Sequence, residues 1–442
     1  MRILFATMPV DGHFNPLTGI AVHLRERGHD VAWYTGPSYQ SKVAALGIPG
    51  FVYQRPTEVT GENIAELFPQ RSRLKGPKLI SFDGDQIFSA PVEGHYRDIV
   101  DIHERFPFDA LFCDVAFFAA KLIGEKLPVR VYTIGVGPML ASSRDVPPPF
   151  FGLKPATSTL GKLVHRGVRA MVHSALKAGM VRYNRLLATE GIPPVTAHEW
   201  FDIPHECAQH CFQDGVPGLD YPRSDLPANI SFVGPLLPHR TSPEAPLGIV
   251  ERLSQNRSKV VVVSQGTVDN HDATKLIEPT LVALKDGPYQ VVVTTGGRNT
   301  DTLRARHTQD NVVIEDFIDF DALFEHADAF VCNGGYGSVQ LALRHGVPIV
   351  GAGTREGKND INARLDHLGL GIDLRTERPK PKQVANCVAA VLADPVIGRS
   401  VARIRDELES YRPFEIIDRQ LEHDTAHLAP KNSNSPHVSD TA

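Results

Sequence analysis

The sequence is poor in cysteine and contains no long apolar run. Its 442 residues include five cysteines, an odd number spread from Cys113 to Cys387. This usage suits a reducing cytoplasm and argues against a disulfide framework. No apolar run approaches the roughly 18 residues that a transmembrane helix needs, and the first one is soon interrupted by Pro9 and Asp11, so it does not resemble a signal sequence. We therefore expect a cytoplasmic protein without a transmembrane segment.

An excess of positive charge is also missing. The 46 Lys and Arg residues face 51 Asp and Glu residues, which gives a formal net charge of −5. This balance argues against a protein that binds nucleic acid through a general basic surface. With 42% apolar and 22% charged residues, the composition is that of a globular protein, and the length favours two domains of roughly 200 residues each.

Motifs for a nicotinamide dinucleotide and for a zinc finger are absent as well. The turn after the first predicted strand does not spell G-x-G-x-x-G, which argues against a nicotinamide site. The segment 205–211 contains four possible metal ligands. However, Cys207 and Cys211 have no second Cys or His pair at finger spacing, so we interpret the segment as a buried strand.

The pattern of apolar residues predicts two α/β domains of similar size. A strand at 2–7, a helix at 17–27 and a strand at 30–35 open a parallel sheet, and a second series begins at 259. The predicted parts are a first domain at 1–235, a Pro-rich linker at 236–256, a second domain at 257–398, a C-terminal helix at 399–422 that Pro413 breaks or bends, and a disordered tail at 423–442.

A glycine-rich turn organises the second domain. A short apolar run at 329–332 is followed by Asn333-Gly334-Gly335-Tyr336-Gly337-Ser338 and then by a helical pattern. Glycines let a ligand approach the backbone, and a helix N-terminus offers N–H groups and a partial positive charge to an anion. Taken alone, the turn fits a phosphate site and an ordinary strand-to-helix turn equally well.

Other candidate residues follow predicted strands at the same sheet edge, where open α/β sheets bind ligands. His13 follows the first strand and suits a general base, or it packs a loop. Asp114 ends another strand and suits a group that orients His13, or it caps a helix. The turn at 264–267 and the polar loop at 354–360 suit a diphosphate and sugar hydroxyls, or they are ordinary turns and solvated loops.

Taken together, these segments resemble the family 1 glycosyltransferases of the GT-B fold, the superfamily of bacterial macrolide and natural-product glycosyltransferases and of UDP-glucuronosyltransferases. The resemblance covers roughly residues 1–420. The residues that carry it are Gly12-His13-Phe14-Asn15-Pro16, Asp114, Ser264-Gln265-Gly266-Thr267, Asn333 to Ser338, His345-Gly346-Val347-Pro348 and Asn362-Ala363-Arg364.

The resemblance implies two Rossmann-like, doubly wound domains that face each other across a cleft, with the helix at 399–422 crossing back to the first domain. The first would bind the acceptor and the second a nucleotide sugar. His13, held by Asp114, would take the proton of an acceptor hydroxyl, and the sugar would be transferred with inversion and without a metal or another cofactor. The diphosphate would contact Gly266, Thr267, Asn333, Gly335, Gly337, Ser338 and Val339, and the nucleobase and ribose would lie near Phe317 and Gln340.

Three positions depart from the family pattern. Asn333 stands where the family usually has His, and an amide can donate to a phosphate but carries no charge. Leu341 stands where the family often has a Glu that holds the ribose, so UDP- and dTDP-hexoses both fit. Lys358-Asn359 replaces the usual Asp-Gln pair, and Glu356, Lys358 and Asn359 are predicted as a group to contact the sugar.

The acceptor is predicted to be an apolar small molecule with a reactive hydroxyl. Five side chains in the first domain are candidates for contacting it, or they belong to the core: Phe82, Phe88, Phe118, Met139 and Phe150. We expect small-molecule partners only, no nucleic acid, and an oligomeric state that the sequence does not set. The alternatives are a nucleotide-sugar epimerase or hydrolase on the same fold, and a binding protein without activity.

Overall fold

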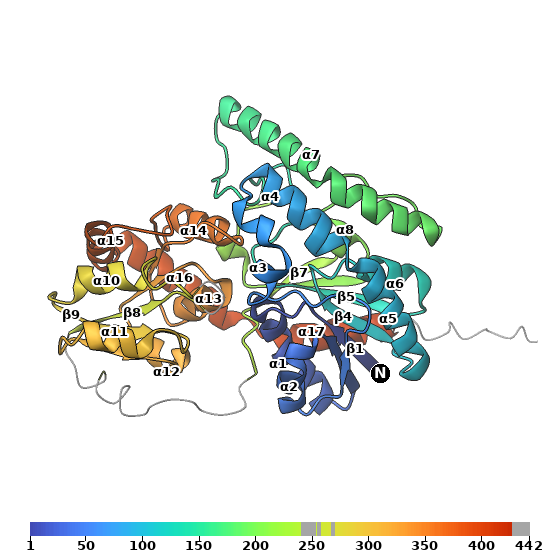
Figure 1. Ribbon diagram of the computed structural model, residues 1–442, viewed down its shortest axis with the longest axis horizontal. Helices are drawn as coiled ribbons and strands as arrows, with labels where there is room; N and C mark the ends of the chain where they lie inside the picture. The colour runs from blue at the N-terminus through green and yellow to red at the C-terminus, as the bar shows by residue number, and fades with distance from the viewer. Residues whose placement is uncertain (240–252, 254–257, 267–269, 427–442) are drawn as a thin grey trace, which may run out of the picture.

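Two parallel β-sheets, one in each half of the chain, form the frame of the molecule (Figure 1). The computed structural model describes residues 1–239, 253, 258–266 and 270–426. The seven-stranded sheet has the order β3 (Gly50–Val52), β2 (Asp30–Thr35), β1 (Arg2–Ala6), β4 (Ala110–Asp114), β5 (Arg130–Gly135), β6 (His210–Asp214) and β7 (Ile230–Gly234). The six-stranded sheet has the order β10 (Val312–Glu315), β9 (Tyr289–Thr294), β8 (Lys259–Ser264), β11 (Ala329–Cys332), β12 (Ile349–Gly351) and β13 (Gly371–Asp373).

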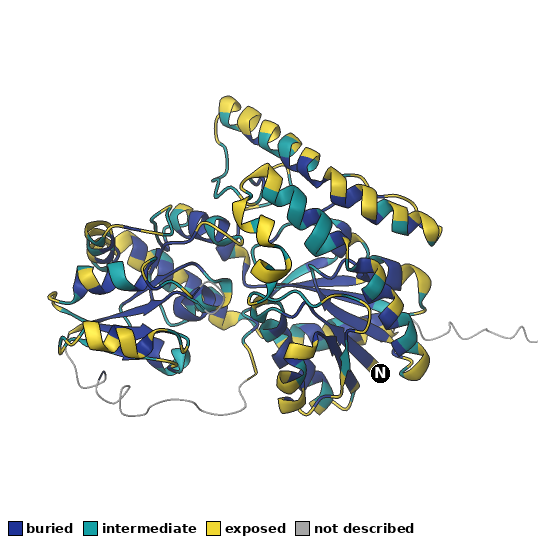
Figure 2. Cartoon of the chain, viewed as in Figure 1, coloured by how far each residue is buried: buried dark blue, intermediate teal, exposed yellow. Residues whose placement is uncertain are grey.

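The central strands are apolar along their whole length because helices cover both faces of each sheet. In β8 the four valines from Val260 to Val263 are all buried, as expected for a parallel strand with no solvated face. Figure 2 shows the central strands of both sheets in the dark blue of buried residues. In each sheet the strand order runs outward in both directions from the middle, which confirms the predicted doubly wound α/β class.

Sixteen described α-helices surround the sheets. Those of the N-terminal half are α1 (Asp11–Glu26), α2 (Gln40–Ala45), α3 (Ile64–Leu67), α4 (Pro77–Phe82), α5 (Val92–Arg105), α6 (Ala120–Lys126), α7 (Thr159–Thr189) and α8 (Ile203–Glu206). Those of the C-terminal half are α10 (Ile277–Leu284), α11 (Thr300–Arg306), α12 (Phe320–Phe324), α13 (Tyr336–Arg344), α14 (Lys358–His367), α15 (Pro381–Ala393), α16 (Pro395–Ser410) and α17 (Pro413–Ala426).

The first helix begins earlier than the sequence pattern predicts. We expected a loop up to Pro16, but α1 begins at Asp11 and contains both His13 and Pro16. Pro16 is the sixth residue of α1, so it leaves the carbonyl of Gly12 without its usual N–H donor, yet the helix continues through it to Glu26. His13 therefore lies in the first helical turn, where the backbone fixes its direction.

The segment at 205–211 is only partly the strand that we predicted. Helix α8 ends at Glu206, and β6 begins at His210. Cys211 is buried in that strand, whereas Cys207 lies in the connection and donates to the carbonyl of Pro204. Across the described ranges, no cluster of three or more His, Cys, Asp or Glu side chains could hold a metal ion.

The predicted C-terminal helix is two helices separated at Pro413. Helix α16 packs into the core of the C-terminal half through Val401, Ile404 and Leu408. Helix α17 instead belongs to the core of the N-terminal half, where Asp424 accepts a hydrogen bond of 2.9 Å from Tyr132. The chain thus returns to its first sheet after completing the second.

Much of the predicted linker at 236–256 lies outside the described residues. Helix α17 continues to Ala426, so the predicted disordered tail at 423–442 was placed too early, and the residues beyond Ala426 lie outside the described part of the chain. None of the described helices is by itself long and apolar enough to cross a membrane. Helices α15 and α16 meet that length and composition only as a pair bent by 70°.

Candidate active site

The side chains of His13 and Asp114 form a hydrogen-bonded pair. Nδ1 of His13 lies 2.8 Å from Oδ1 of Asp114, although 101 residues separate them in the sequence. Strands β1 and β4 are neighbours in the sheet, so the residues that follow their carboxyl ends meet at one edge. The completely buried Asp114 carboxylate also accepts the N–H groups of Met8 and Ala116, at 3.1 and 2.8 Å.

These contacts determine which nitrogen of His13 is basic. Because the Asp114 oxygens accept hydrogen bonds from backbone N–H groups, Nδ1 of His13 is the donor in the pair and Nε2 carries the lone pair. No residue of the described chain hydrogen-bonds to Nε2. Burial alone lowers the pKa of His13, but the charge and hydrogen bond of Asp114 outweigh it, so the pKa of His13 is raised. The pair has the chemistry of a general base.

The glycine turn lies between β11 and α13. Gly334 has a φ of +87°, and a Cβ at this position would lie 2.4 Å from Oδ1 of Asn362, so only glycine fits. Gly335 caps α13, and the first helical bond joins the N–H of Val339 to the carbonyl of Gly335 at 3.0 Å. The preceding N–H groups of Tyr336, Gly337 and Ser338 have no intrahelical acceptor and can bind an anion.

Helix α1, which carries His13, contacts helix α13, which follows the glycine turn. The predicted base and the predicted anion site are therefore on elements that touch across the two halves of the chain. Such an arrangement can bring an acceptor hydroxyl close to a diphosphate-linked carbon.

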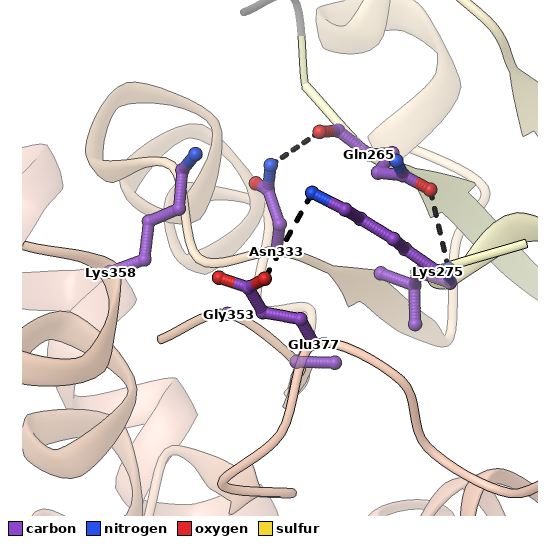
Figure 3. Close-up of a pocket in the computed structure, with 8 residues that line it drawn as sticks. Gln265, Lys275, Asn333, Gly353, Lys358 and Glu377 are labelled. Atoms are coloured by element: carbon purple, nitrogen blue, oxygen red, sulfur yellow. Dashed lines mark hydrogen bonds and ion pairs between the residues drawn. The ribbon is translucent and has the colours of Figure 1, made fainter. Parts of the chain in front are cut away.

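A small pocket lies beside the glycine turn (Figure 3). Its lining residues are Gln265, Lys275, Leu276, Asn333, Ala352, Gly353, Lys358 and Glu377. The amide of Asn333 donates to the carbonyl of Gln265 and so ties the ends of β11 and β8 together. Lys275 and Lys358 bring positive charge to the pocket, which suits an anionic ligand.

Lys275 and Glu377 are pocket residues that the sequence patterns did not single out. The carboxylate of Glu377 lies 3.9 Å from Nζ of Lys275 and accepts a 3.0 Å hydrogen bond from Thr354. Glu377 follows β13, the strand next to β12, so it lies at the same sheet edge as the glycine turn. Its position after a strand is the sequence feature that could have identified it. Lys275 lies far beyond the end of β8, in a long connection. Its position in the sequence therefore does not indicate that it lies near the glycine turn.

The other predicted diphosphate residues are placed as follows. Oγ of Ser338 donates to the carbonyl of Gly335 at 3.0 Å, and Val339 is completely buried. A Cβ on Gly337 would meet no atom within 4 Å, whereas one on Gly266 would lie 3.0 Å from the Asn333 amide. Thr267 lies outside the described residues.

The two residues predicted near the nucleobase and ribose lie in different surroundings. Phe317 follows β10 and is 60% exposed, so its ring is available for stacking. Gln340 is buried, and its amide donates to Oδ2 of Asp214 in the N-terminal half at 2.9 Å. Gln340 is thus engaged at the contact between the halves and is not among the residues that line the pocket, and its contact with the ribose stays a prediction.

The side chains of the predicted sugar-contacting loop point in different directions. Glu356 and Lys358 form an ion pair of 2.8 Å, and Lys358 lines the pocket. Asn359 turns to the N-terminal half, where its amide donates to the carbonyl of Phe150 at 2.7 Å. Only part of the predicted group is therefore directed at the pocket.

Of the predicted acceptor residues, Phe118 and Met139 are buried core side chains. Phe118 packs against Trp200 with ring centroids 4.8 Å apart. Phe82 and Phe88 are partly buried, and Phe150 is 37% exposed. The accessible candidates for an apolar acceptor are therefore Phe82, Phe88 and Phe150, whereas the other two pack within the domain.

The C-terminal part of the chain, residues 280–422, matches the model of the erythromycin biosynthesis protein CIII-like C-terminal domain. The chain is 34% identical over 407 residues to 4'-demethylrebeccamycin synthase of Lentzea aerocolonigenes, with 92% of this chain and 95% of that protein covered. It is 30% identical over 432 residues to UDP-glycosyltransferase 2 of Phaeomoniella chlamydospora, with 94% of each protein covered.

Solved structures share the same fold. The calicheamicin glycosyltransferase CalG4 superimposes with a TM-score of 0.74 at 21% identity, covering 97% of this chain and 99% of that one. The spinosyn rhamnosyltransferase SpnG, solved in complex with thymidine diphosphate, gives a TM-score of 0.67 at 16% identity, covering 96% and 100%. Both are glycosyltransferases by name. From these similarities along nearly its whole length, the chain belongs to the UDP-glycosyltransferase-like glycosyltransferases of the GT-B fold, the type that glycosylates natural products.

Proposed function

We propose that this glycosyltransferase moves a hexose from a UDP- or dTDP-linked donor to a hydroxyl of a hydrophobic small-molecule acceptor, with inversion at the anomeric carbon. The observation that carries the proposal is the His13–Asp114 pair. It combines a raised His13 pKa, a buried carboxylate held by two backbone N–H groups, and a position on the helix that contacts α13.

In the proposed reaction, Nε2 of His13 takes the proton of the acceptor hydroxyl. The acceptor oxygen forms its bond to the anomeric carbon while the bond from that carbon to the diphosphate oxygen breaks, on the opposite face. Asp114 stabilises the imidazolium that results and holds the ring in place. The N–H groups at the start of α13 and the ammonium of Lys358 stabilise the charge on the departing diphosphate.

The proposal keeps both donor nucleotides open. One relative is named a UDP-glycosyltransferase, whereas the SpnG structure contains thymidine diphosphate. In this chain the buried Leu341 replaces a carboxylate that would bind ribose hydroxyls, so the site does not require a 2′-hydroxyl. The exposed ring of Phe317 is the proposed stacking surface for either pyrimidine.

A hydrophobic acceptor is supported by the side chains of the N-terminal half. Phe82 and Phe68 pack edge to face at 5.4 Å, and both are only partly buried. Phe150 is exposed on the loop that contacts α14. SpnG has also been solved with the spinosyn aglycone; an aglycone-type alcohol is the acceptor class that we propose here.

The test is a mass-spectrometric screen of UDP- and dTDP-hexoses against a panel of apolar alcohols and phenols. We expect a product that carries one added hexose, and NMR of this product should show the anomeric configuration opposite to that of the donor. EDTA should leave turnover unchanged, because protein groups supply the positive charge at the diphosphate. A control with donor alone addresses the alternative: a rearranged or hydrolysed sugar nucleotide without acceptor would favour an epimerase or hydrolase and contradict the proposal.

A further inference from the structure

Helix α7 lies along the outer edge of the N-terminal half and extends beyond the elements beneath it (Figure 1). Its inner face is buried through residues such as Val172, Leu176 and Tyr183. Its first turns carry exposed residues almost all the way round, and its outer edge is exposed along its length (Figure 2). No other described element covers this outer edge, so it is available to a partner.

The exposed end of α7 is apolar. Leu160, Leu163 and Val164 are 71%, 59% and 51% exposed. They follow each other at helical spacing, with Gly167 one turn further on, so they form one continuous strip. Single exposed apolar residues are common on protein surfaces, but three large ones on adjacent turns at the tip of a projecting helix indicate a contact surface.

The charge of α7 is unlike that of the whole chain. The helix contains six Lys and Arg residues and no Asp or Glu, whereas the chain has a net charge of −5. Two of the six are used within the protein: Arg169 donates to the carbonyl of Ser143, and Arg182 pairs with Asp85 at 2.7 Å. The remaining four are exposed and have no ion-pair partner in the described ranges: Lys162, Arg166, Lys177 and Arg185.

We propose that the outer face of α7 binds an anionic lipid surface. Arg166, Lys177 and Arg185, which lie on or beside the apolar strip, would lie among the lipid phosphates, and Leu160, Leu163 and Val164 would enter the region between headgroups and acyl chains. A helix with unpaired basic residues beside an apolar strip and no acidic residue has the chemistry of an interfacial membrane helix. The proposal is independent of the sugar and acceptor assigned above.

Charge complementarity favours this occupant over a second copy of the chain. A symmetric dimer through this face would place α7 against α7 and bring Arg166, Lys177 and Arg185 of each copy together. An anionic bilayer instead attracts each basic side chain, with a gain of roughly fivefold in partition per residue near the surface.

The experiment is sedimentation of the full chain with vesicles of phosphatidylcholine alone or mixed with phosphatidylglycerol. We expect at least tenfold stronger partition into the anionic vesicles. Raising the salt from about 0.1 M to about 1 M shortens the Debye length from about 10 to about 3 Å and should release the protein. Equal partition into both vesicle types, or none into either, would overturn the proposal.

Matched variants locate the surface. Val164 on α7 and Val282 on α10 are equally exposed, at 51%, so Val164→Glu should lower partition at least tenfold and Val282→Glu should not. Arg166 on α7 and Arg399 on α16 allow the same comparison for charge. Arg166→Glu should lower partition and Arg399→Glu should not. Transfer to a water-soluble acceptor should be retained in all four. If Val164→Glu instead dissolves a dimer seen by sedimentation velocity and leaves vesicle partition unchanged, the face binds a second copy and the proposal is wrong.

Discussion

The carboxylate of Asp360 accepts the backbone N–H of Phe150, a residue of the other half of the molecule. It also accepts the N–H of Gly152 at 2.7 Å and contacts that of Phe151. Phe150 and Gly152 have φ values of +75° and +58°, and this backbone conformation turns three successive N–H groups towards one anion. The helix that begins at the predicted sugar-contacting loop thus holds the predicted acceptor loop in place.

The Asp360 contact predicts a selective effect on the acceptor. Asp360→Ala should raise the acceptor KM about tenfold or more, because hydrogen bonds to a charged group are each worth about 1.5–3 kcal/mol and the left-handed conformation of Phe150 loses its support. The donor KM should change less than about threefold. Asp360→Asn, which keeps one oxygen, should restore part of the effect. The control is Asp366→Ala, which removes a surface ion pair with Lys154; an equal rise of the donor KM in Asp360→Ala would contradict the account.

Two glycines of the same turn should respond differently to alanine. Gly334→Ala should abolish measurable binding of UDP and dTDP, because the new Cβ meets Asn362 at 2.4 Å and the φ of +87° is unfavourable for alanine. Gly337→Ala should bind the nucleotides as wild type does, since its Cβ meets nothing within 4 Å and its N–H is kept. Calorimetric titration of both variants measures this. Loss of nucleotide binding in Gly337→Ala but not in Gly334→Ala would contradict this account of the glycine turn.

Asp214 predicts a pH-dependent stability. Burial raises the pKa of Asp214 from 3.8 to about 7, against the hydrogen bonds from Leu236 and Gln340. The folded state therefore keeps a proton that the unfolded state releases, so the stabilising contribution of this group is present below about pH 4 and is lost as the pH rises to about 7.

Asp214→Asn removes this titration. The Tm of the wild type minus the Tm of Asp214→Asn should therefore fall as the pH rises from about 4 to about 7. Above that range it should stay constant. Thermal unfolding at several pH values checks this. Gln340→Leu serves as the control that breaks the same contact without removing the titrating group, and a difference independent of pH would exclude the role of Asp214.

Several residues of the site could be predicted from sequence because they follow strands of a parallel sheet. His13 follows β1 and Asp114 ends the neighbouring strand β4, so their meeting depends mainly on strand order. The glycine turn was visible as a pattern in one continuous segment. Features that depend on how the two halves pack could not be predicted: the contact of Gln340 with Asp214, and that of Asp360 with Phe150, join residues with no shared local pattern.

Burial of individual side chains was the other limit. Phe118 and Phe150 are the same residue type and each adjoins another phenylalanine, yet one packs on Trp200 in the core and the other is exposed. Residue type alone does not show which side of a loop faces the core. The start of α1 was missed because a proline usually marks a helix boundary, whereas α1 begins five residues before Pro16 and continues through it.

The His13–Asp114 pair predicts the pH profile of transfer. The base must be neutral, so kcat/KM should rise with pH and level off above the raised pKa of His13, which lies above 6.5. Asp114→Asn removes the charge that raises this pKa. Its profile should therefore shift to lower pH and reach a lower plateau, and an unshifted acid limb in Asp114→Asn would show that another group is titrating.

The most direct test of the central claim is the single-turnover rate of hexose transfer by His13→Ala, measured together with its dissociation constant for the donor nucleotide. General base catalysis is worth about 10²–10⁴ in rate, so the variant should lose about that factor while its donor affinity stays within about threefold of wild type. A His13→Ala enzyme that transfers sugar at the wild-type rate would contradict the assignment of His13 as the base.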